Sequence, residues 1–200
     1  MKRSVLPLLG LLLAAGCTST TPPPPAEYLL QPSPESESTR GGAGGYAVAL
    51  GRIDLAPYLD RQGIVVESSD GTVTAAQGHR WAEPLAHSLR RVLQLEIARD
   101  SGLAVAAPPR RGHGAGTIVD VDVYQFHGTE DGVVRLVADW TLRQPRDNRI
   151  VGHHQLVREM HTSADGYDAL VRTHLALAEA LGAAIARSIG EVDATAPRQP

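Results

Sequence analysis

The clearest pattern along the chain is an alternation of apolar and polar side chains in residues 117–126. Alternation at every second residue is typical of a strand that buries one face. Residues 134–140 and 150–160 continue the pattern after turn sequences of Asp-Gly at 131–132 and Asp-Asn at 147–148. We therefore predict a three-stranded antiparallel meander in this part of the chain.

Shorter β patterns precede the meander. They lie at residues 27–30, 46–55 and 103–105, and a hairpin is predicted where residues 64–67 and 72–75 flank a Ser-Asp-Gly turn.

Two segments instead repeat apolar residues every three or four positions, as the buried face of a helix does. The first begins at Pro84, where the missing N–H costs nothing, and runs to about Arg99. The second begins at Asp165, with Asp168 completing a partial capping box. Together the elements predict an α+β two-layer domain, in which a mostly antiparallel sheet of about six strands carries two main helices on one face.

The N-terminus has the pattern of a secretory signal peptide. Lys2 and Arg3 form a basic start, and an apolar run of about a dozen residues follows. This run is too short to span a bilayer core of about 30 Å. We predict that residues 1–16 are a signal peptide that is removed from the mature chain.

The end of this segment resembles the bacterial lipobox, in which a cysteine is acylated and becomes the new N-terminus. Two small residues precede Cys17, the only cysteine of the chain, although Ala14 occupies a position where leucine is usual. We predict that Cys17 is lipidated, and a plain signal peptide with a chance cysteine is the alternative. Thr18 and Ser19 follow without an aspartate, which by resemblance to enterobacterial sorting rules favours the outer membrane.

Composition divides the remaining chain into three parts. Residues 17–45 hold the acylated cysteine, a proline-rich tether and a low-complexity linker with one short strand. Residues 46–190 carry the predicted domain. Residues 191–200 are predicted to form a flexible tail.

Composition and charge exclude several classes of protein. The chain has 200 residues, one cysteine, 19 Lys+Arg, 22 Asp+Glu and a formal net charge of −3. A single cysteine excludes a disulfide framework and a multi-cysteine metal site, and the acidic balance gives no case for nucleic-acid binding. Loss of Lys2 and Arg3 with the signal peptide would leave a net charge of −5, which disfavours adhesion to anionic lipid headgroups.

The residues that could carry chemistry do not form a recognisable catalytic, cofactor or metal site. His153 and His154 are adjacent on a strand and therefore point to opposite faces. Asp120 and Asp122 share a strand face about 7 Å apart and could bind a cation or act as acid and base, but a solvated strand face is the interpretation that we prefer. His174 falls in the apolar stripe of the second helix, which predicts a hydrogen-bonded core or interface histidine rather than a metal ligand. Nucleophile-elbow, P-loop and dinucleotide-binding motifs are absent from the sequence.

Three segments combine residues in a way that ordinary loops do not require. Residues 55–61 contain a proline–tyrosine turn, residues 80–85 open the first helix, and residues 126–140 form a hairpin. Arg80 and Glu83 could form an ion pair at the helix start. Aromatic residues number only eight in the chain, and we predict that three of them anchor a thin core, namely Trp81, Phe126 and Trp140.

These segments, in this order behind a lipobox, resemble the pattern of the ABC-type transport auxiliary lipoprotein family, the PqiC-like group. The resemblance covers nearly the whole mature chain, from Tyr28 to about Ile189, and departs from the family at Gln62-Gly63, where a proline is frequent. The matching residues are Pro57, Tyr58, Leu59, Asp60 and Arg61, then Arg80, Trp81, Ala82, Glu83, Pro84 and Leu85, then Phe126, Gly128, Gly132, Ala138 and Trp140.

The resemblance implies a non-catalytic auxiliary domain at residues 46–190, without a cofactor. Family members look like lipoproteins that are anchored in the outer membrane, face the periplasm and assist phospholipid transport with an inner-membrane complex containing an MCE-domain protein. We expect the domain to dock this complex, with a ring of identical copies as one arrangement. The docking surfaces that we nominate are the turn (Pro57, Tyr58, Asp60, Arg61) and the hairpin tip (Gly128, Asp131, Gly132), and rigid structural turns are the alternative.

Two functions from other classes stay open. One is a lipid- or lipopolysaccharide-binding assembly lipoprotein with its own cavity, and a weaker one is a periplasmic hydrolase. A lipid cavity needs surplus apolar lining, and the small number of aromatic residues argues against a large one.

Overall fold

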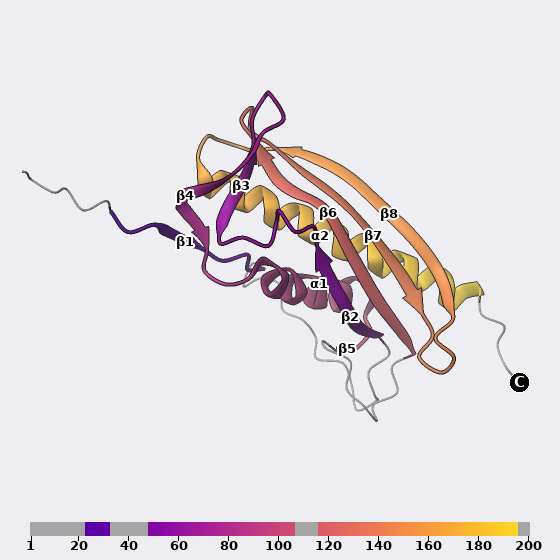
Figure 1. The fold of residues 1–200 in the computed structure, drawn as a ribbon. Helices are drawn as coiled ribbons and strands as arrows, with labels where there is room; N and C mark the ends of the chain where they lie inside the picture. Colours follow the sequence, from indigo (N-terminus) through magenta and orange to yellow (C-terminus); the bar gives the residue numbers. More distant parts are fainter. Residues whose placement is uncertain (1–22, 33–47, 107–115, 196–200) are drawn as a thin grey trace, which may run out of the picture.

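A computed structural model describes residues 23–32, 48–106 and 116–195 of the chain. These residues form eight strands and two helices (Figure 1). In chain order the elements are β1 (Ala26–Tyr28), β2 (Val48–Leu55), β3 (Gly63–Glu67), β4 (Val73–Trp81), α1 (Leu85–Ser101), β5 (Val105–Ala106), β6 (Thr117–Thr129), β7 (Val133–Arg143), β8 (Ile150–His161) and α2 (Tyr167–Thr195).

All eight strands belong to one sheet, and that sheet is mixed. β6, β7 and β8 form the antiparallel meander that the sequence predicts, and β3 and β4 form the predicted hairpin. β6 also pairs in parallel with β2 and with β3, while β1 pairs in parallel with β4 and β5 with β2. The prediction of a mostly antiparallel sheet is therefore wrong, because turn signals in a sequence report hairpins and not pairings between distant segments.

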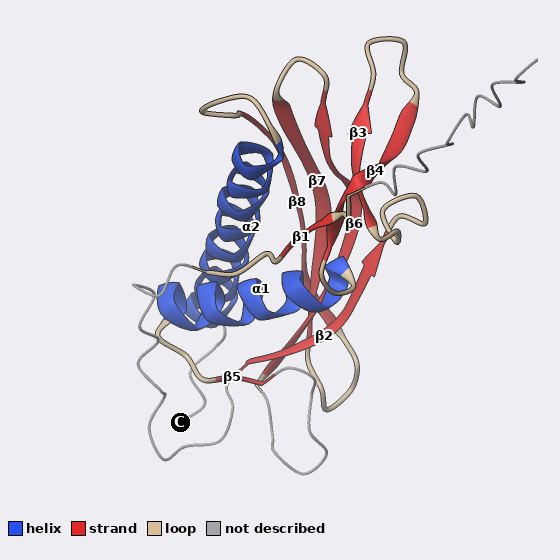
Figure 2. Ribbon diagram, turned by 90° about the vertical axis from the view of Figure 1, so that its left-hand side faces the viewer, coloured by secondary structure: helices blue, strands red, loops and turns tan. Residues whose placement is uncertain are grey.

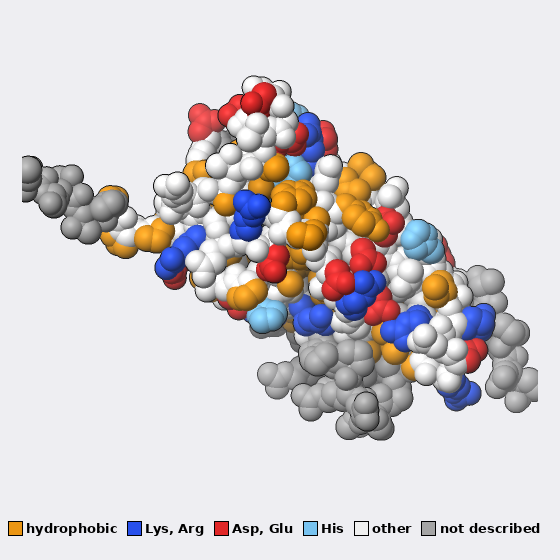
Figure 3. Space-filling view, viewed as in Figure 1, with side chains coloured by type: hydrophobic (Ala, Val, Ile, Leu, Met, Phe, Trp, Pro, Cys, Tyr) orange, Lys and Arg blue, Asp and Glu red, His pale blue; other side chains and the backbone are white. Residues whose placement is uncertain are grey.

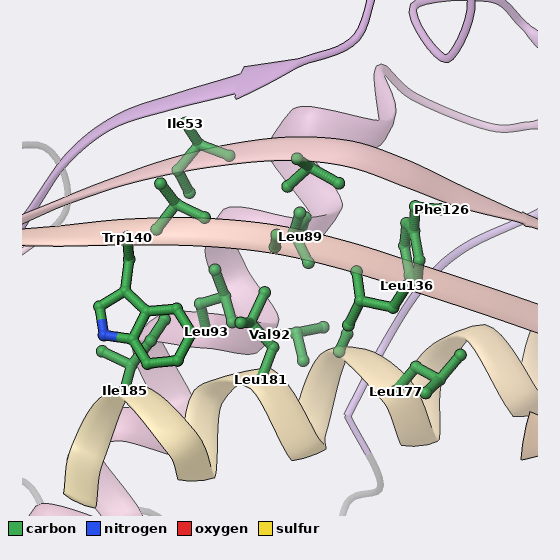
Figure 4. Close-up of a cluster of buried hydrophobic side chains, with 14 of the residues drawn as sticks. Ile53, Leu89, Val92, Leu93, Phe126, Leu136, Trp140, Leu177, Leu181 and Ile185 are labelled. Atoms are coloured by element: carbon green, nitrogen blue, oxygen red, sulfur yellow. The ribbon is translucent and has the colours of Figure 1, made fainter. Parts of the chain in front are cut away.

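The two helices cover one face of the sheet, which confirms the predicted α+β architecture (Figure 2). On β7, every second side chain from Val134 to Leu142 is buried beneath them. Figure 4 shows Leu136 and Trp140 pointing from the sheet toward α2. The predicted anchors are all nearly inaccessible to solvent: Trp81, Phe126 and Trp140 are 6%, 1% and 4% exposed.

Several element boundaries differ from those that the sequence predicts. β4 continues to Trp81, so Arg80 and Trp81 end a strand and Glu83-Pro84 links it to α1. α2 continues to Thr195, so residues 191–195, predicted as part of the tail, are helical. β1 lies in the predicted linker, and Leu30 just after it is fully buried in the core. The short strand predicted at residues 27–30 is therefore present as β1, and it pairs with β4 as part of the sheet.

α1 and α2 cross at close range, and a glycine permits the contact. A Cβ atom built on Gly182 of α2 would lie 2.5 Å from Cβ of Glu96 on α1. α2 is long and apolar enough to cross a membrane, with a mean hydropathy of 1.3 in an 18-residue window within Tyr167–Val192, but 56% of that window is buried within the domain. Here it is the core helix of the two-layer fold, which explains its apolar composition.

His174 lies at the centre of the core, as the sequence predicts. It is 1% exposed, its Nδ1 donates to the Leu170 carbonyl over 2.8 Å, and its ring meets those of Trp81 and Phe126 edge to face. Burial is the main cause that lowers the pKa of His174 to about 4. The imidazole is therefore neutral in the folded protein at neutral pH.

The buried histidine predicts that stability falls with acidification. In the unfolded chain His174 takes up a proton below its ordinary pKa of about 6.5, whereas the folded chain resists this until about pH 4. The free energy of unfolding should therefore drop by about 2 kcal/mol between pH 7.5 and pH 5 from this group alone. Urea denaturation across this range should show the drop. A His174→Leu variant that shows an equally steep loss would contradict the assignment.

Candidate functional site

β6 has a gap along one of its edges, and the first nominated segment fills it. β2 pairs with β6 as far as Val123, and β3 begins to pair only at Gly128. Between these points the connection from β2 to β3 runs beside β6, and its first N–H, that of Ala56, donates to the Val123 carbonyl over 2.8 Å. We call residues 57–61 of this connection the edge turn. It takes the place of a strand in the sheet.

Tyr58 anchors the edge turn to β6. Its hydroxyl lies 2.8 Å from Nδ1 of His127 and 3.2 Å from the Tyr124 carbonyl, and Leu59 beside it is buried in the core. Burial, and secondarily the negative charge of Glu67, raise the pKa of Tyr58 to about 12. The phenol therefore stays protonated and can act as a hydrogen-bond donor.

A chain of polar contacts continues from His127 across the sheet. Nε2 of His127 lies 3.0 Å from Oε2 of Glu67, which also accepts from Nη1 of Arg135 over 2.8 Å, and Arg135 in turn donates to Glu159 over 2.8 Å. A carboxylate can only accept, so Nε2 of His127 carries a proton and donates it to Glu67. The hydrogen bond from His127, with help from Arg135, lowers the pKa of Glu67. The edge turn is thus linked to β3, β6, β7 and β8.

The residues of the edge turn divide into anchors and exposed groups. Tyr58 is half-buried and bonded to the sheet, whereas Pro57, Asp60 and Arg61 are exposed. The turn therefore presents an apolar ring and two opposite charges on a rigid support. That geometry suits a docking surface, and docking itself stays a prediction.

The hairpin tip between β6 and β7 has a different construction. Gly128 is buried against α2, where a Cβ would lie 2.5 Å from Cδ1 of Leu170, and Gly132 has a φ of 76°, which favours glycine. Asp131 is exposed and accepts from the Thr129 hydroxyl, a hydrogen bond that lowers the pKa of its carboxyl. Of the three nominated tip residues, only Asp131 presents a side chain to a partner.

A shallow pocket of about 530 Å³ lies between the hairpin tip and the start of α2. Its lining is mostly polar or glycine, with Val66, Tyr167 and Leu170 as the larger apolar contributions. Ligand cavities for apolar molecules are lined mainly by hydrophobic side chains. This pocket therefore does not suit an acyl chain.

The helix-free face of the sheet carries the acidic pair at Asp120 and Asp122. Asp120 accepts from Arg143 over 2.8 Å and from the Arg52 backbone N–H, while Asp122 pairs with the Arg52 guanidinium over 3.0 Å. Figure 3 shows acidic and basic side chains interleaved on this face, with apolar groups among them. Arginine side chains bind both carboxylates, which leaves Asp120 and Asp122 poorly placed for acid–base chemistry.

The histidines are arranged as their sequence positions predict. His153 is exposed on the helix-free face near Asp139, whereas His154 stacks on Trp140 on the other face, with ring centroids 5.4 Å apart. Among the described residues, no group of three or more His, Cys, Asp or Glu side chains could hold a metal ion. Cys17 lies outside the described residues.

Residues 80–85, the segment that precedes and begins α1, form ion pairs that the sequence did not predict. Arg80 binds Glu27 of β1 over 2.6 Å, and Glu83 binds Arg91 of α1 and the Ser88 hydroxyl. The predicted Arg80–Glu83 pair is therefore wrong, because β4 and the start of α1 send these side chains to different neighbours. His127 and Glu67 were also missed, since only the pairing of β3 with β6 brings them together.

Comparison with known proteins places these features in a family. A model of the ABC-type transport auxiliary lipoprotein component family matches residues 28–186. The intermembrane transport lipoprotein PqiC of Escherichia coli K12 is 27% identical over 176 residues, which cover 88% of this chain and 91% of that protein, and the Shigella flexneri PqiC matches equally.

Two crystal structures share the fold. One, of an uncharacterized protein, has a TM-score of 0.69 with 22% identity, over 84% of this chain and 99% of its own. The other, of a Xanthomonas campestris protein, has a TM-score of 0.64 with 18% identity, over 78% of this chain and 94% of its own.

The anchoring of the edge turn predicts that removal of the Tyr58 hydroxyl lowers the stability of the domain. A Tyr58→Phe substitution leaves His127 and the Tyr124 carbonyl without their partner and should lower the free energy of unfolding by about 1–2 kcal/mol. Hydrogen exchange of residues 56–61 should accelerate more than that of α1 or α2. An Asp60→Ala variant is the matched control in the same turn, and its stability should change by less than about 0.5 kcal/mol. Equal exchange in Tyr58→Phe and wild type would show that the hydroxyl does not hold the turn.

Proposed function

Because the chain belongs to the ABC-type transport auxiliary lipoprotein component family, we propose that it is a non-catalytic subunit of a phospholipid transport system of the MCE type. In this proposal the domain sits in the periplasm, is anchored in the outer membrane through Cys17, and docks an inner-membrane complex that contains an MCE-domain protein. The observation that carries the proposal is the family match, which extends over residues 28–186 and therefore includes β2 to β8, the whole of α1 and most of α2. The related E. coli protein is named as an intermembrane transport lipoprotein, which supports the same role.

The length of the tether supports attachment close to a membrane. Eight residues lie between Cys17 and Ala26, where β1 begins, so the two are nine residue steps apart, and four of the eight are consecutive prolines at positions 22–25. At about 3.1 Å per residue in a polyproline II conformation, this segment reaches about 28 Å. An acylated Cys17 would therefore keep the β1 end of the sheet within about 28 Å of the lipid surface.

The edge turn is the docking surface that we favour. It presents Pro57, Asp60 and Arg61 outward on a support that is fixed by Tyr58. A rigid surface loses little conformational entropy when a partner binds. The hairpin tip contributes Asp131 as a second contact, while Gly128 and Gly132 are explained by packing and backbone geometry.

The alternative function, a lipid- or lipopolysaccharide-binding lipoprotein with its own cavity, has less support. The core is filled by side chains of both helices and of the sheet, and the pocket beside the hairpin tip is lined mostly by polar residues and glycine. A domain with a filled core would assist lipid transport through its partners rather than enclose a lipid itself. Lipid extraction of purified protein separates the two, since phospholipid bound in a one-to-one ratio would favour the alternative.

The docking proposal predicts loss of a partner when the charges of the edge turn are reversed. The full chain with an affinity tag at its C-terminus, extracted from cell envelopes in mild detergent, should co-purify an MCE-domain protein that mass spectrometry identifies. An Asp60→Arg, Arg61→Glu double variant should reduce the recovered amount at least tenfold while its thermal unfolding is unchanged.

A charge reversal outside the polar contact chain provides the control. Arg146→Glu changes an exposed charge in the turn between β7 and β8 and should leave the recovery unchanged. If wild-type protein recovers no MCE-domain protein, the partnership is wrong. If the double variant and wild type recover equal amounts, the edge turn is not the docking surface.

The anchor has its own test. A Cys17→Ser variant cannot receive a thioether-linked lipid, so it should move from the outer-membrane fraction to the soluble periplasmic fraction, because the acyl chains supply most of the membrane affinity. Metabolic labelling with a fatty acid should mark the wild-type chain alone. A Cys17→Ser chain that still sediments with outer membranes would show that something other than this lipid holds it there.

A further inference from the structure

Apolar side chains form an exposed row across three neighbouring strands of the helix-free face. Val157 of β8 is 64% exposed and lies directly opposite Val137 of β7. Val137 in turn lies opposite Gln125 of β6, and the preceding Tyr124 is 48% exposed. Figure 3 shows apolar groups close together in the middle of this face. We call Tyr124, Val137 and Val157 the apolar row.

A β-bulge exposes Tyr124, and the same residue joins the apolar row to the edge turn. The register of β6 against β7 shifts between Val123 and Gln125, and Tyr124 and Gln125 are consecutive exposed residues. The Tyr124 carbonyl accepts from the Tyr58 hydroxyl over 3.2 Å. The apolar row is therefore continuous with the edge turn, the docking surface that we favour.

A row of carboxylates runs beside the apolar row, two residues away along β6 and β7. Asp54 of β2 pairs in register with Asp122 of β6, and Asp122 lies directly opposite Asp139 of β7. Like charges directly opposite each other destabilise a sheet. The guanidinium of Arg52 binds Asp54 and Asp122. This row thus holds three carboxylates and one guanidinium, which leaves a surplus of negative charge.

Asp139 is the member of the carboxylate row that lacks a close cation. Its side chain is 17% exposed, and within the described part of the chain its Oδ1 is buried without a hydrogen-bond partner. The Tyr124 hydroxyl and Nε2 of His153 approach Oδ2 over 3.5 and 3.7 Å, which is long for a hydrogen bond. The negative charge of Asp139 is the main cause that raises the pKa of Tyr124. A largely buried carboxylate without a close donor costs free energy that an added cation would recover.

We propose that this face binds a segment of the MCE-domain partner in which a lysine or arginine pairs with Asp139 and adjacent apolar side chains cover the apolar row. The identity of the partner rests on the proposed function. The chemistry of the segment rests on the two rows, because one needs a cation and the other needs apolar contact.

The charge and composition of the face favour this occupant over a lipid surface. Surplus carboxylates repel anionic headgroups and attract a basic segment. Tyrosine is enriched where proteins meet, since its ring supplies apolar contact area while its hydroxyl stays polar. Removal of the exposed Val157 side chain from water adds to the binding free energy. A segment that carries both a cation and apolar side chains satisfies both rows at once.

Removal of one charge tests the predicted ion pair. In the full chain, tagged at its C-terminus and extracted from cell envelopes in mild detergent, Asp139→Asn should recover about tenfold less MCE-domain protein than wild type. Its thermal unfolding should not fall, because no close cation is lost. Asp139→Glu keeps the carboxylate and should retain most of the recovery. Asp147→Asn is the matched control, since it neutralises an exposed aspartate in the turn between β7 and β8 and should leave recovery unchanged.

A photo-crosslinking residue identifies what covers the apolar row. Benzoylphenylalanine incorporated in place of Val157, in the full chain in living cells, should link to the MCE-domain protein next to one of its lysines or arginines. The same residue in place of Ile150 is the matched control, because that side chain is 60% exposed at the far end of the same strand. It should give little or no linkage to this partner.

The outcomes separate this proposal from the transport function. Equal recovery by Asp139→Asn and wild type, equal linkage from position 150, or linkage of position 157 to a second copy of this chain or to lipid would each overturn the proposal, while recovery by wild type would still support the transport function. If wild type recovers no MCE-domain protein and position 157 links to none, the transport function is wrong and this proposal fails with it.

Discussion

Strand β6 is the element on which the rest of the structure depends. β7 pairs along one of its edges, while β2 and β3 share the other, each over its own length. The gap between β2 and β3 leaves backbone groups of β6 without a strand partner, and buried backbone groups must find a hydrogen bond elsewhere. The Ala56 N–H and the Tyr58 hydroxyl supply bonds to the carbonyls of Val123 and Tyr124. A turn that the sequence marks as unusual is thus required by the way in which the sheet is assembled.

An irregularity of β6 at the start of this gap explains why a histidine lies beneath the turn. A β-bulge between Val123 and Gln125 shifts the alternation of β6 by one residue. Phe126 therefore faces the helices, and His127 faces the opposite side, where Tyr58 and Glu67 enclose it. The turn is therefore held to the sheet in two ways: by bonds to the backbone of β6 and by the polar contact chain that begins at His127. The helix-free face combines such fixed groups with exposed ones, as a surface that meets other proteins does.

Local pattern sufficed to predict the meander, the hairpin and both helices. The valines of β6 alternate with aspartates, and the apolar stripe of α2 repeats with helical spacing, so each element reveals its own type. The parallel pairings could not be predicted, because β2 and β6 are separated by some sixty residues with no turn signal that joins them. The core histidine at position 174 was found from its stripe, whereas His127 was missed because the bulge breaks the alternation just before it. The predicted pair of Arg80 and Glu83 was wrong because closeness in the sequence at the end of a strand does not determine where the side chains point.

β1 has a consequence for how the domain would respond to force. Its three residues run parallel to β4, Arg80 binds Glu27 at its side, and the fully buried Leu30 follows it. Tension on the preceding residues acts along the strand axis, so the β1–β4 hydrogen bonds share the load in shear instead of opening one after another. Leu30 acts as a stop, because it would have to leave the core before the strand could slide. A short strand at the start of the fold can thus resist a pull that its length alone would not suggest.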